Sequence, residues 1–214
     1  MSSNPLTIRY DLDGWQLLWA IVETANAEDV ETAAVRKDVA AAVRRRFPDT
    51  ASIASDATVA AMRKLFRAAG CDPTRYRPAS EALIRRLVKG GELPAIQPIV
   101  DLNNCLSVEV AVPCCVMAES TFGTELVLRA GLPGESYQSL RGPFNLEKKP
   151  VLADLDGAVD TPITGNEKVK VHSDTARAWL VAYLPSEQVA LAKAGEALRN
   201  LAGRCGLGVE LLAD

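Results

Sequence analysis

The stretch TRYRPASEALIRRLVKGGELPAIQPIVDLNN, residues 74–104, predicts a helix followed by an apolar passage. Pro78 suits the first turn of a helix, and the pair Gly90-Gly91 supplies a left-handed stop at its end. The apolar residues between these limits recur at helical spacing and are expected to form the buried stripe. They are Leu83, Ile84, Leu87 and Val88.

The outer face of this helix is basic, and it is expected to carry Glu81, Arg85, Arg86 and Lys89. From Arg36 to Lys89 the chain has thirteen basic and five acidic residues, a local charge of +8. The whole protein has a net charge of −3 and a pI near 5.4. A block of one sign commonly marks a surface for a polyanion. Solvated helix faces would give the same count, so both interpretations stay open.

Two further helices are expected before this one. Val35, Val39 and Val43 recur every four residues in a segment from Glu28 to Phe47, which ends with the basic run 44–46 before Pro48. The second helix is expected to begin at an N-cap, Asp56, and to stop at Gly70.

Strands are expected on both sides of the helical region. Residues 8–12 and 16–23 predict a hairpin that turns at Asp13-Gly14. After the basic helix the period changes to that of strands. These later strands are expected at 96–100, 107–112, 125–129, 150–153 and 177–184, followed by a helix from Ser186 to about Leu201 and a last strand at 209–212. Early helices and later strands predict an α+β fold.

Composition excludes several classes of protein. A hydrophobic content of 48% and a charged content of 24% are globular values. The N-terminus lacks the pattern of a signal peptide, and no apolar run approaches the roughly 20 residues that span a bilayer, so a cytoplasmic protein without a membrane partner is expected. The five cysteines contain no C-x-x-C, and His172 is the only histidine. We therefore expect free thiols, no metal site and no cofactor.

No generic catalytic motif is present. The only possible nucleophile pair involving histidine is Cys115 with His172, if the fold brings them together. Three polar groupings remain as candidate sites, and each has a structural alternative.

The first grouping, Arg75, Tyr76, Arg77 and Ser80, lies at a helix N-terminus, where guanidinium groups and free backbone N–H groups suit a phosphate or a carboxylate. The alternative is that Arg77 caps against a carboxylate of the fold. The second, Asp101, Asn103 and Asn104, interrupts an apolar passage and either binds a ligand or forms a turn. The third is the polar segment Thr161 to Thr175. Its candidate contacts are Thr164, Asn166, Glu167 and His172, and an exposed loop would look the same.

Residues 74–104, followed by TPITGNEKVKVHSDT at 161–175 and ARAWLVAYLP at 176–185, resemble the tRNA-binding and editing domain of the phenylalanyl-tRNA synthetase β subunit. The resemblance covers residues 72–185 and is closer to free-standing relatives of that domain. It implies one α+β domain, with residues 1–71 before the matching segment and 186–214 closing it. In the synthetases this domain hydrolyses tyrosine wrongly esterified to tRNA, so tRNA or aminoacyl-tRNA is the implied partner.

The resemblance also implies a pocket. Asp101 and Asn104 match the family's Asp and Asn, which line the pocket wall. The family's histidine falls on Cys115 in VPCC, and the glutamate that recognises the tyrosine hydroxyl falls on Val181. A valine there cannot bind a hydroxyl, so tyrosine editing is not expected.

The implied activity is hydrolysis of a mischarged aminoacyl-tRNA in trans, with no ligase activity. Asn104, Thr164 and Glu167 are the candidates for positioning water or the ester. The RNA backbone would contact Arg44, Arg45, Arg85, Arg86 and Lys89. The alternative is a non-catalytic binder of tRNA, or of a small amino-acid or nucleoside ligand. The sequence predicts no particular amino acid, tRNA or oligomeric state.

Overall fold

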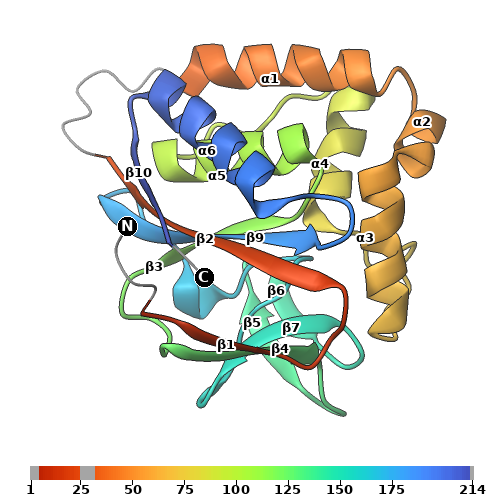
Figure 1. Cartoon of the computed structure of the whole chain (residues 1–214), viewed down its shortest axis with the longest axis vertical. Helices are drawn as coiled ribbons and strands as arrows, with labels where there is room; N and C mark the ends of the chain where they lie inside the picture. Colours follow the sequence, from red (N-terminus) through yellow and green to blue (C-terminus); the bar gives the residue numbers. More distant parts are fainter. Residues whose placement is uncertain (1–4, 25–31, 213–214) are drawn as a thin grey trace.

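Two β-sheets are stacked beneath a layer of helices in the computed structural model, which describes residues 5–24 and 32–212 (Figure 1). The central sheet has the strand order β10-β2-β9-β3, and the second sheet has the order β1-β4-β7-β8. The central strands are β2 (Trp15–Glu23), β3 (Cys114–Ala118), β9 (Arg177–Pro185) and β10 (Gly208–Leu211). The second sheet contains β1 (Thr7–Tyr10), β4 (Glu125–Ala130), β7 (Pro150–Asp154) and β8 (Gly157–Asp160). A separate hairpin is formed by β5 (Ser136–Ser139) and β6 (Gly142–Asn145).

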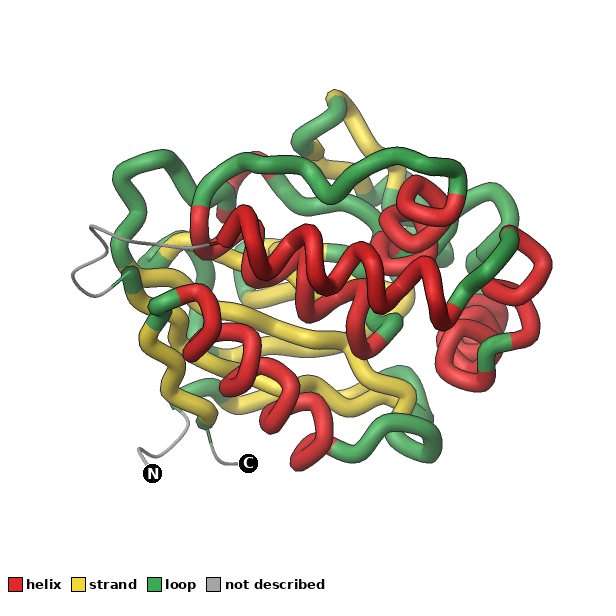
Figure 2. Tube along the Cα trace, turned by 90° about the horizontal axis from the view of Figure 1, so that it is seen from above, coloured by secondary structure: helices red, strands yellow, loops and turns green. Residues whose placement is uncertain are grey.

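The helices lie over one face of the central sheet, and Figure 2 looks down on this layer. They are α1 (Thr32–Arg46), α2 (Thr50–Ser55), α3 (Ala57–Ala68), α4 (Ala79–Val88), α5 (Pro98–Val110) and α6 (Leu191–Cys205). A short 3₁₀ helix, η1 (Glu167–Val169), lies instead beside β3, β5 and β8. None of the described helices combines the length and apolar composition that crossing a membrane requires.

The central sheet is apolar on both faces because it is covered on both. Strands β2 and β9 pair antiparallel from Trp15↔Pro185 to Glu23↔Arg177. Successive side chains of a strand point to opposite faces. Leu18 lies beside Gly195 of α6, whereas Tyr183 contacts Asp160 of β8. One face therefore packs against the helices and the other against the second sheet.

The predicted N-terminal hairpin is wrong. β1 pairs in parallel with β4 in the second sheet, from Thr7↔Glu125 to Tyr10↔Leu128, while β2 lies between β9 and β10. The turn at Gly14 exists, with a positive φ of 80°, but it carries the chain from one sheet to the other. The two strands also differ in burial, since β1 is mostly exposed and β2 is mostly buried. This difference agrees with their places, β1 at the edge of the second sheet and β2 inside the central sheet.

The two strands predicted at 96–100 and 107–112 are also wrong, because one helix, α5, spans most of both segments. Gln97 caps it by accepting a hydrogen bond from the backbone N–H of Ile99 (3.2 Å), and Pro98 occupies its first turn. The helix ends at Ala111, which has a left-handed φ of 61°. Nearly every side of α5 is buried, so its sequence lacks the polar face that reveals a helix.

The α+β class is confirmed, as are α3 with its cap Asp56, α4 with its stop at Gly90, and strands β4, β7, β9 and β10. Helix α1 begins at Thr32 in the described chain, and the predicted start at 28–31 lies outside the described residues. Helix α2 and strands β3, β5, β6 and β8 were not predicted as elements. Helix α6 begins at Leu191 rather than Ser186, because Gln188 and Val189 both donate to the carbonyl of Pro185 in a turn.

Candidate functional site

Helix α4 carries an open surface hollow of about 330 Å³. It is lined by Arg77, Ala82, Arg85, Arg86 and Lys89, and we call it the α4 hollow. Four of its five lining residues are cationic. Ala82, Arg85, Arg86 and Lys89 are spaced three or four residues apart and so share one side of α4, whereas Arg77 precedes the helix at its N-terminal end. Three predicted RNA-backbone residues and one predicted anion-binding residue are thus brought together at this hollow.

The remaining two predicted RNA-backbone residues lie on α1. Arg44 caps the end of α4, where its Nε donates to the carbonyl of Leu87 (3.1 Å) and its Nη2 to that of Gly91 (2.7 Å). A guanidinium at this point satisfies carbonyls that the helix leaves free and offsets the negative end of its dipole. Arg45 is exposed and does not line the hollow.

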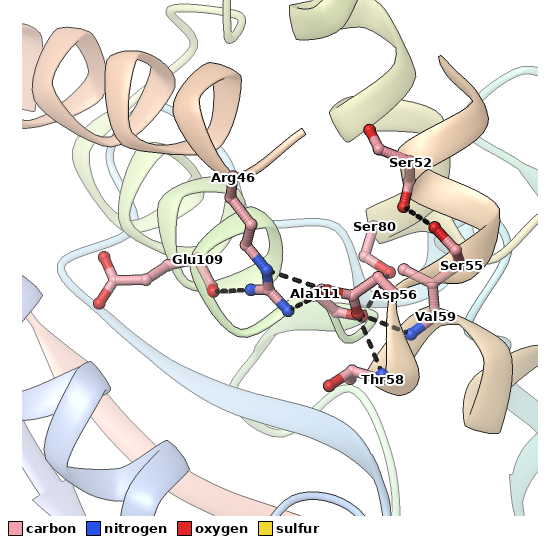
Figure 3. Close-up of polar contacts among 9 residues, drawn as sticks. All are labelled: Arg46, Ser52, Ser55, Asp56, Thr58, Val59, Ser80, Glu109 and Ala111. Carbon is pink, nitrogen blue, oxygen red and sulfur yellow. Dashed lines mark hydrogen bonds and ion pairs between the residues drawn. The ribbon is translucent and has the colours of Figure 1, made fainter. Parts of the chain in front are cut away.

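The N-terminal end of α4 is held within the fold. Ser80 is buried, and its hydroxyl donates to the carbonyl of Ala111 at 3.4 Å (Figure 3). The backbone N–H of Ala79 donates to the carbonyl of Pro162 at 2.9 Å. The start of α4 therefore lies beside the segment that follows β8, and two of the predicted polar groupings meet there. The hydroxyl of Ser80 thus has a structural role, whereas Arg77 forms no ion pair with a carboxylate within residues 5–24 and 32–212.

Arg75 and Tyr76 belong to an aromatic cluster. The guanidinium carbon of Arg75 lies 5.1 Å from the centroid of the Tyr76 ring, and the Nζ of Lys149 lies 4.1 Å from it. Phe144 meets Tyr76 edge to face, with 6.0 Å between centroids. Lys149 is buried, and burial lowers the pKa of its ammonium group. Stacking on Tyr76 and Phe144 compensates part of the lost hydration.

Cys115 and Val181 lie opposite each other in neighbouring strands, at the register pair Cys115↔Val181 of β3 and β9. They are the two positions that the sequence resemblance assigned to the pocket histidine and glutamate. Beside them lies the buried carboxyl of Asp160, whose Oδ2 accepts a hydrogen bond from the Tyr183 hydroxyl at 2.6 Å. The Oδ1 of Asp160 has no partner among the described residues. We call Cys115, Asp160, Val181 and Tyr183 the inter-sheet cluster.

Burial controls ionisation in this cluster. It raises the pKa of Asp160 to about 7, although hydrogen bonds from Tyr183 and Cys115 oppose the shift. Burial and the neighbouring Asp160 raise the pKa of Cys115 well above its ordinary value. A thiol that keeps its proton is a weak nucleophile. His172 is exposed and no described contact joins it to Cys115, so the geometry gives no support to a Cys115–His172 pair.

The α5 grouping divides into a structural and an unpaired part. Asp101 is buried and forms an ion pair with Arg36. It also accepts hydrogen bonds from the Thr32 hydroxyl (3.1 Å) and the backbone N–H of Ile96 (3.0 Å). Asp101 is thus fully used in joining α1 to α5. In contrast, the Oδ1 of the buried Asn103 has no partner among the described residues, and half-buried Asn104 has no side-chain hydrogen bond to them.

The segment at 161–175 contributes mainly backbone contacts. The carbonyl of Thr164 accepts a hydrogen bond from the Tyr137 hydroxyl at 2.5 Å. Asn166 caps η1 and donates to the carbonyl of Ala158 (3.0 Å). Glu167 is exposed and pairs with Lys170 at 3.5 Å. These residues are not brought into contact with Asn104 by any described hydrogen bond.

Sequence reasoning missed Asp160, Tyr183 and Lys149, and it placed Glu81 on the exposed face although only 1% of that residue is exposed. A signal exists for Asp160, which closes the apolar alternation of β8 with an acid just before Thr161-Pro162. No local pattern marks Lys149 or Glu81, because their burial depends on neighbours distant in sequence.

The protein is a mixed α+β domain in which α4 presents a cationic hollow and the inter-sheet cluster lies between the two sheets. A family model described as the B3/4 domain matches residues 61–203, and the chain belongs to that family. The match extends beyond the predicted range 72–185 at both ends. No curated protein sequence matches the chain.

One solved structure with the same fold is an N-terminal fragment of the phenylalanyl-tRNA synthetase β-subunit from Pyrococcus horikoshii. The TM-score is 0.51 and the sequence identity 13%, and the superposition covers 98% of this chain and 51% of that one. This chain therefore spans about half the length of the fragment. At this identity the likeness concerns the fold alone. The resemblance inferred from the sequence is confirmed for family and fold.

Proposed function

We propose that this chain is a tRNA-binding protein that hydrolyses a mischarged aminoacyl-tRNA ester in trans. The observation that carries the proposal is the α4 hollow, where four cationic side chains gather in a protein of net negative charge. Cationic hollows attract phosphate backbones by releasing bound counterions. We propose tRNA as the bound RNA because of the family match and the likeness in fold to a fragment of a phenylalanyl-tRNA synthetase subunit. The expected compartment is the cytoplasm.

The inter-sheet cluster supports the hydrolytic part. The Cys115↔Val181 pair brings the two positions assigned to the pocket into one place, and neither side chain is built to select a phenolic hydroxyl. Asp160 lies beside them with a pKa of about 7, so its carboxyl can accept a proton near neutral pH. Asn104, with an unpaired amide, remains the candidate for orienting the ester. We propose a small or aliphatic amino acid as the cleaved group.

A panel of mischarged tRNAs tests this function. Each is incubated with the protein, and release of the amino acid is followed over time. We expect turnover of a tRNA that carries a small or aliphatic residue, and loss of most of that turnover in Asn104→Ala and in Asp160→Asn. A matched tRNA that carries tyrosine serves as the negative control. Retained tRNA binding without turnover across the panel would instead establish the non-catalytic alternative.

A further inference from the structure

Glu81 is the buried acid of α4, and it binds two arginines from different helices. Its Oε2 accepts a hydrogen bond from the Nε of Arg63 on α3 at 2.9 Å. Its Oε1 accepts one from the Nε of Arg85 on α4 at 2.8 Å. Each carboxylate oxygen is thus assigned to one guanidinium. Because only 1% of Glu81 is exposed, water screens these contacts far less than it screens a surface pair.

This contact fixes the orientation of Arg85. A guanidinium is planar, so a hydrogen bond to its Nε sets the direction of both terminal nitrogens. Those nitrogens carry four further N–H donors and have no acidic partner among the described residues. Arg85 lines the α4 hollow. A guanidinium held in place loses less side-chain entropy when it binds a phosphate through two parallel hydrogen bonds.

The hollow keeps a net positive charge although Glu81 lies beneath it. Glu81 carries one negative charge between two arginines, so the three side chains together remain +1. Arg77, Arg86 and Lys89 also line the hollow, and within residues 5–24 and 32–212 none of them has an ion-pair partner. Arg44 adds a guanidinium at the carbonyl end of α4.

We infer that the α4 hollow is a binding site for a phosphate group and that Glu81 is its positioning residue, which aims the Arg85 fork at that phosphate. The inference rests on the proposed function in one respect, since the phosphate is taken to belong to tRNA. A free phosphate or pyrophosphate presents the same chemistry, so the experiment uses both kinds of ligand.

The substitution Glu81→Gln distinguishes the two explanations by the direction in which the affinity for anions changes. If charge alone governed the hollow, removing an acid beneath it would raise affinity for anions. If Glu81 positions Arg85, its loss lowers affinity instead. We expect Glu81→Gln to weaken binding of a labelled tRNA three- to tenfold, measured by filter binding at fixed salt, and to weaken inorganic pyrophosphate, measured by calorimetry, in the same direction. Unchanged or stronger binding of both ligands would overturn the positioning role.

A second single variant, Arg85→Lys, keeps the test decisive if Glu81→Gln fails to fold. Arg85→Lys preserves the charge but removes the planar fork, and it should weaken both ligands about as much as Glu81→Gln. If Glu81→Gln folds, the double variant should bind about as weakly as either single variant, because both substitutions disrupt the same Glu81–Arg85 contact. Wild-type affinity in a folded Arg85→Lys protein would contradict the inference.

The two ligands separate this inference from the proposed function. If pyrophosphate follows the expected pattern but tRNA does not bind, the phosphate site stands and the tRNA function fails. If tRNA binds and depends on Arg86 and Lys89 but is indifferent to Glu81→Gln and Arg85→Lys, the function stands and the positioning role fails.

Discussion

Two buried acids, Asp160 and Glu81, show how one type of side chain takes different roles in different surroundings. Glu81 forms ion pairs with two guanidinium groups, one on each carboxylate oxygen. Asp160 has no cationic partner among the described residues, and a tyrosine hydroxyl is its closest described donor. Burial therefore dominates at Asp160 and raises its pKa to about 7. Glu81 thus serves in an ion-pair network between two helices, whereas Asp160 is a buried acid whose pKa lies near neutral pH.

The raised pKa of Asp160 predicts that stability falls as pH rises. Between about pH 4, where an unfolded aspartate ionises, and about pH 7 the folded protein holds a proton that the unfolded chain has lost. The contribution of Asp160 to the free energy of unfolding should therefore be greatest below the unfolded pKa and should decrease by at most about 1.4 kcal/mol per pH unit up to pH 7. The carboxyl groups whose pKa is lowered, such as Asp49 and Asp72, give the opposite slope, so the Asp160 contribution is read as the difference from a variant without this carboxyl. Urea denaturation at a series of pH values measures this slope.

Asp160→Asn is the matched control for that slope, because an amide oxygen can still accept the Tyr183 hydrogen bond but does not titrate. The other titratable groups that face Asp160 are Cys115, Tyr183 and Tyr137, and burial raises the pKa of all three. They stay protonated through this range and add no slope. Equal slopes in wild type and Asp160→Asn would show that Asp160 ionises at an ordinary pKa.

At the scale of elements, local pattern predicted α4 and failed at α5. Helix α4 has a proline at its start, glycine at its end and a basic outer side, and all of these are properties of neighbouring residues. Helix α5 is buried on most sides, so its apolar run resembles a strand until its cap at Gln97 is considered. The false hairpin has the same origin, because the choice between β4 and β2 as the partner of β1 is made by contacts distant in sequence. The candidate site divides in the same way. The cations of the hollow are neighbours along one helix and were predicted, whereas the contact between Asp160 and Tyr183 joins strands distant in sequence and was missed.

Asp101 joins α1 to the start of α5, and removing its carboxylate should be severe. Asp101→Ala leaves Arg36 half-buried without its partner and leaves the N–H of Ile96 unpaired. Breaking one member of a buried ion pair costs about 3–5 kcal/mol. We expect urea denaturation to show a loss of that order. Asn104→Ala is the comparison on the same helix, and since Asn104 has no described hydrogen bond, it should cost less than about 1 kcal/mol.

Asp56 caps α3 and also receives Arg46 from the end of α1 (Figure 3). Its Oδ1 accepts from the backbone N–H groups of Thr58 (3.0 Å) and Val59 (3.2 Å). Asp56→Ala should lower the free energy of unfolding by about 1–2 kcal/mol for the cap, and by up to about 1 kcal/mol more for the partly exposed pair with Arg46. Thermal denaturation measures the loss. Arg46→Gln keeps the cap but removes the pair, together with the hydrogen bond from Arg46 to the carbonyl of Glu109 (2.9 Å). A loss in Asp56→Ala no larger than the loss in Arg46→Gln would therefore contradict a contribution from the cap.

At the scale of the whole molecule, the layered fold separates two properties. The central sheet, covered on both faces, holds the inter-sheet cluster away from solvent, whereas α4 lies among the covering helices and presents its cations outward. The contact from Ala79 to Pro162 joins them, since Pro162 follows Asp160 by two residues.

This separation predicts that salt dependence belongs to α4 alone. Log affinity for RNA falls with log salt concentration by roughly 0.7 to 0.9 for each phosphate contact that is made. Arg86→Gln combined with Lys89→Gln should therefore reduce the slope for tRNA by about 1.4 to 1.8, measured by filter binding from low to physiological salt. The charge-matched control is Lys193→Gln with Arg199→Gln on α6, where both side chains are exposed and neither lines the hollow. If long-range attraction to the net charge governed binding, the α4 and α6 double variants would lower the affinity for tRNA equally. That result would contradict the assignment of the hollow as the RNA site. A slope that falls only in the α4 variant assigns the phosphate contacts to that helix.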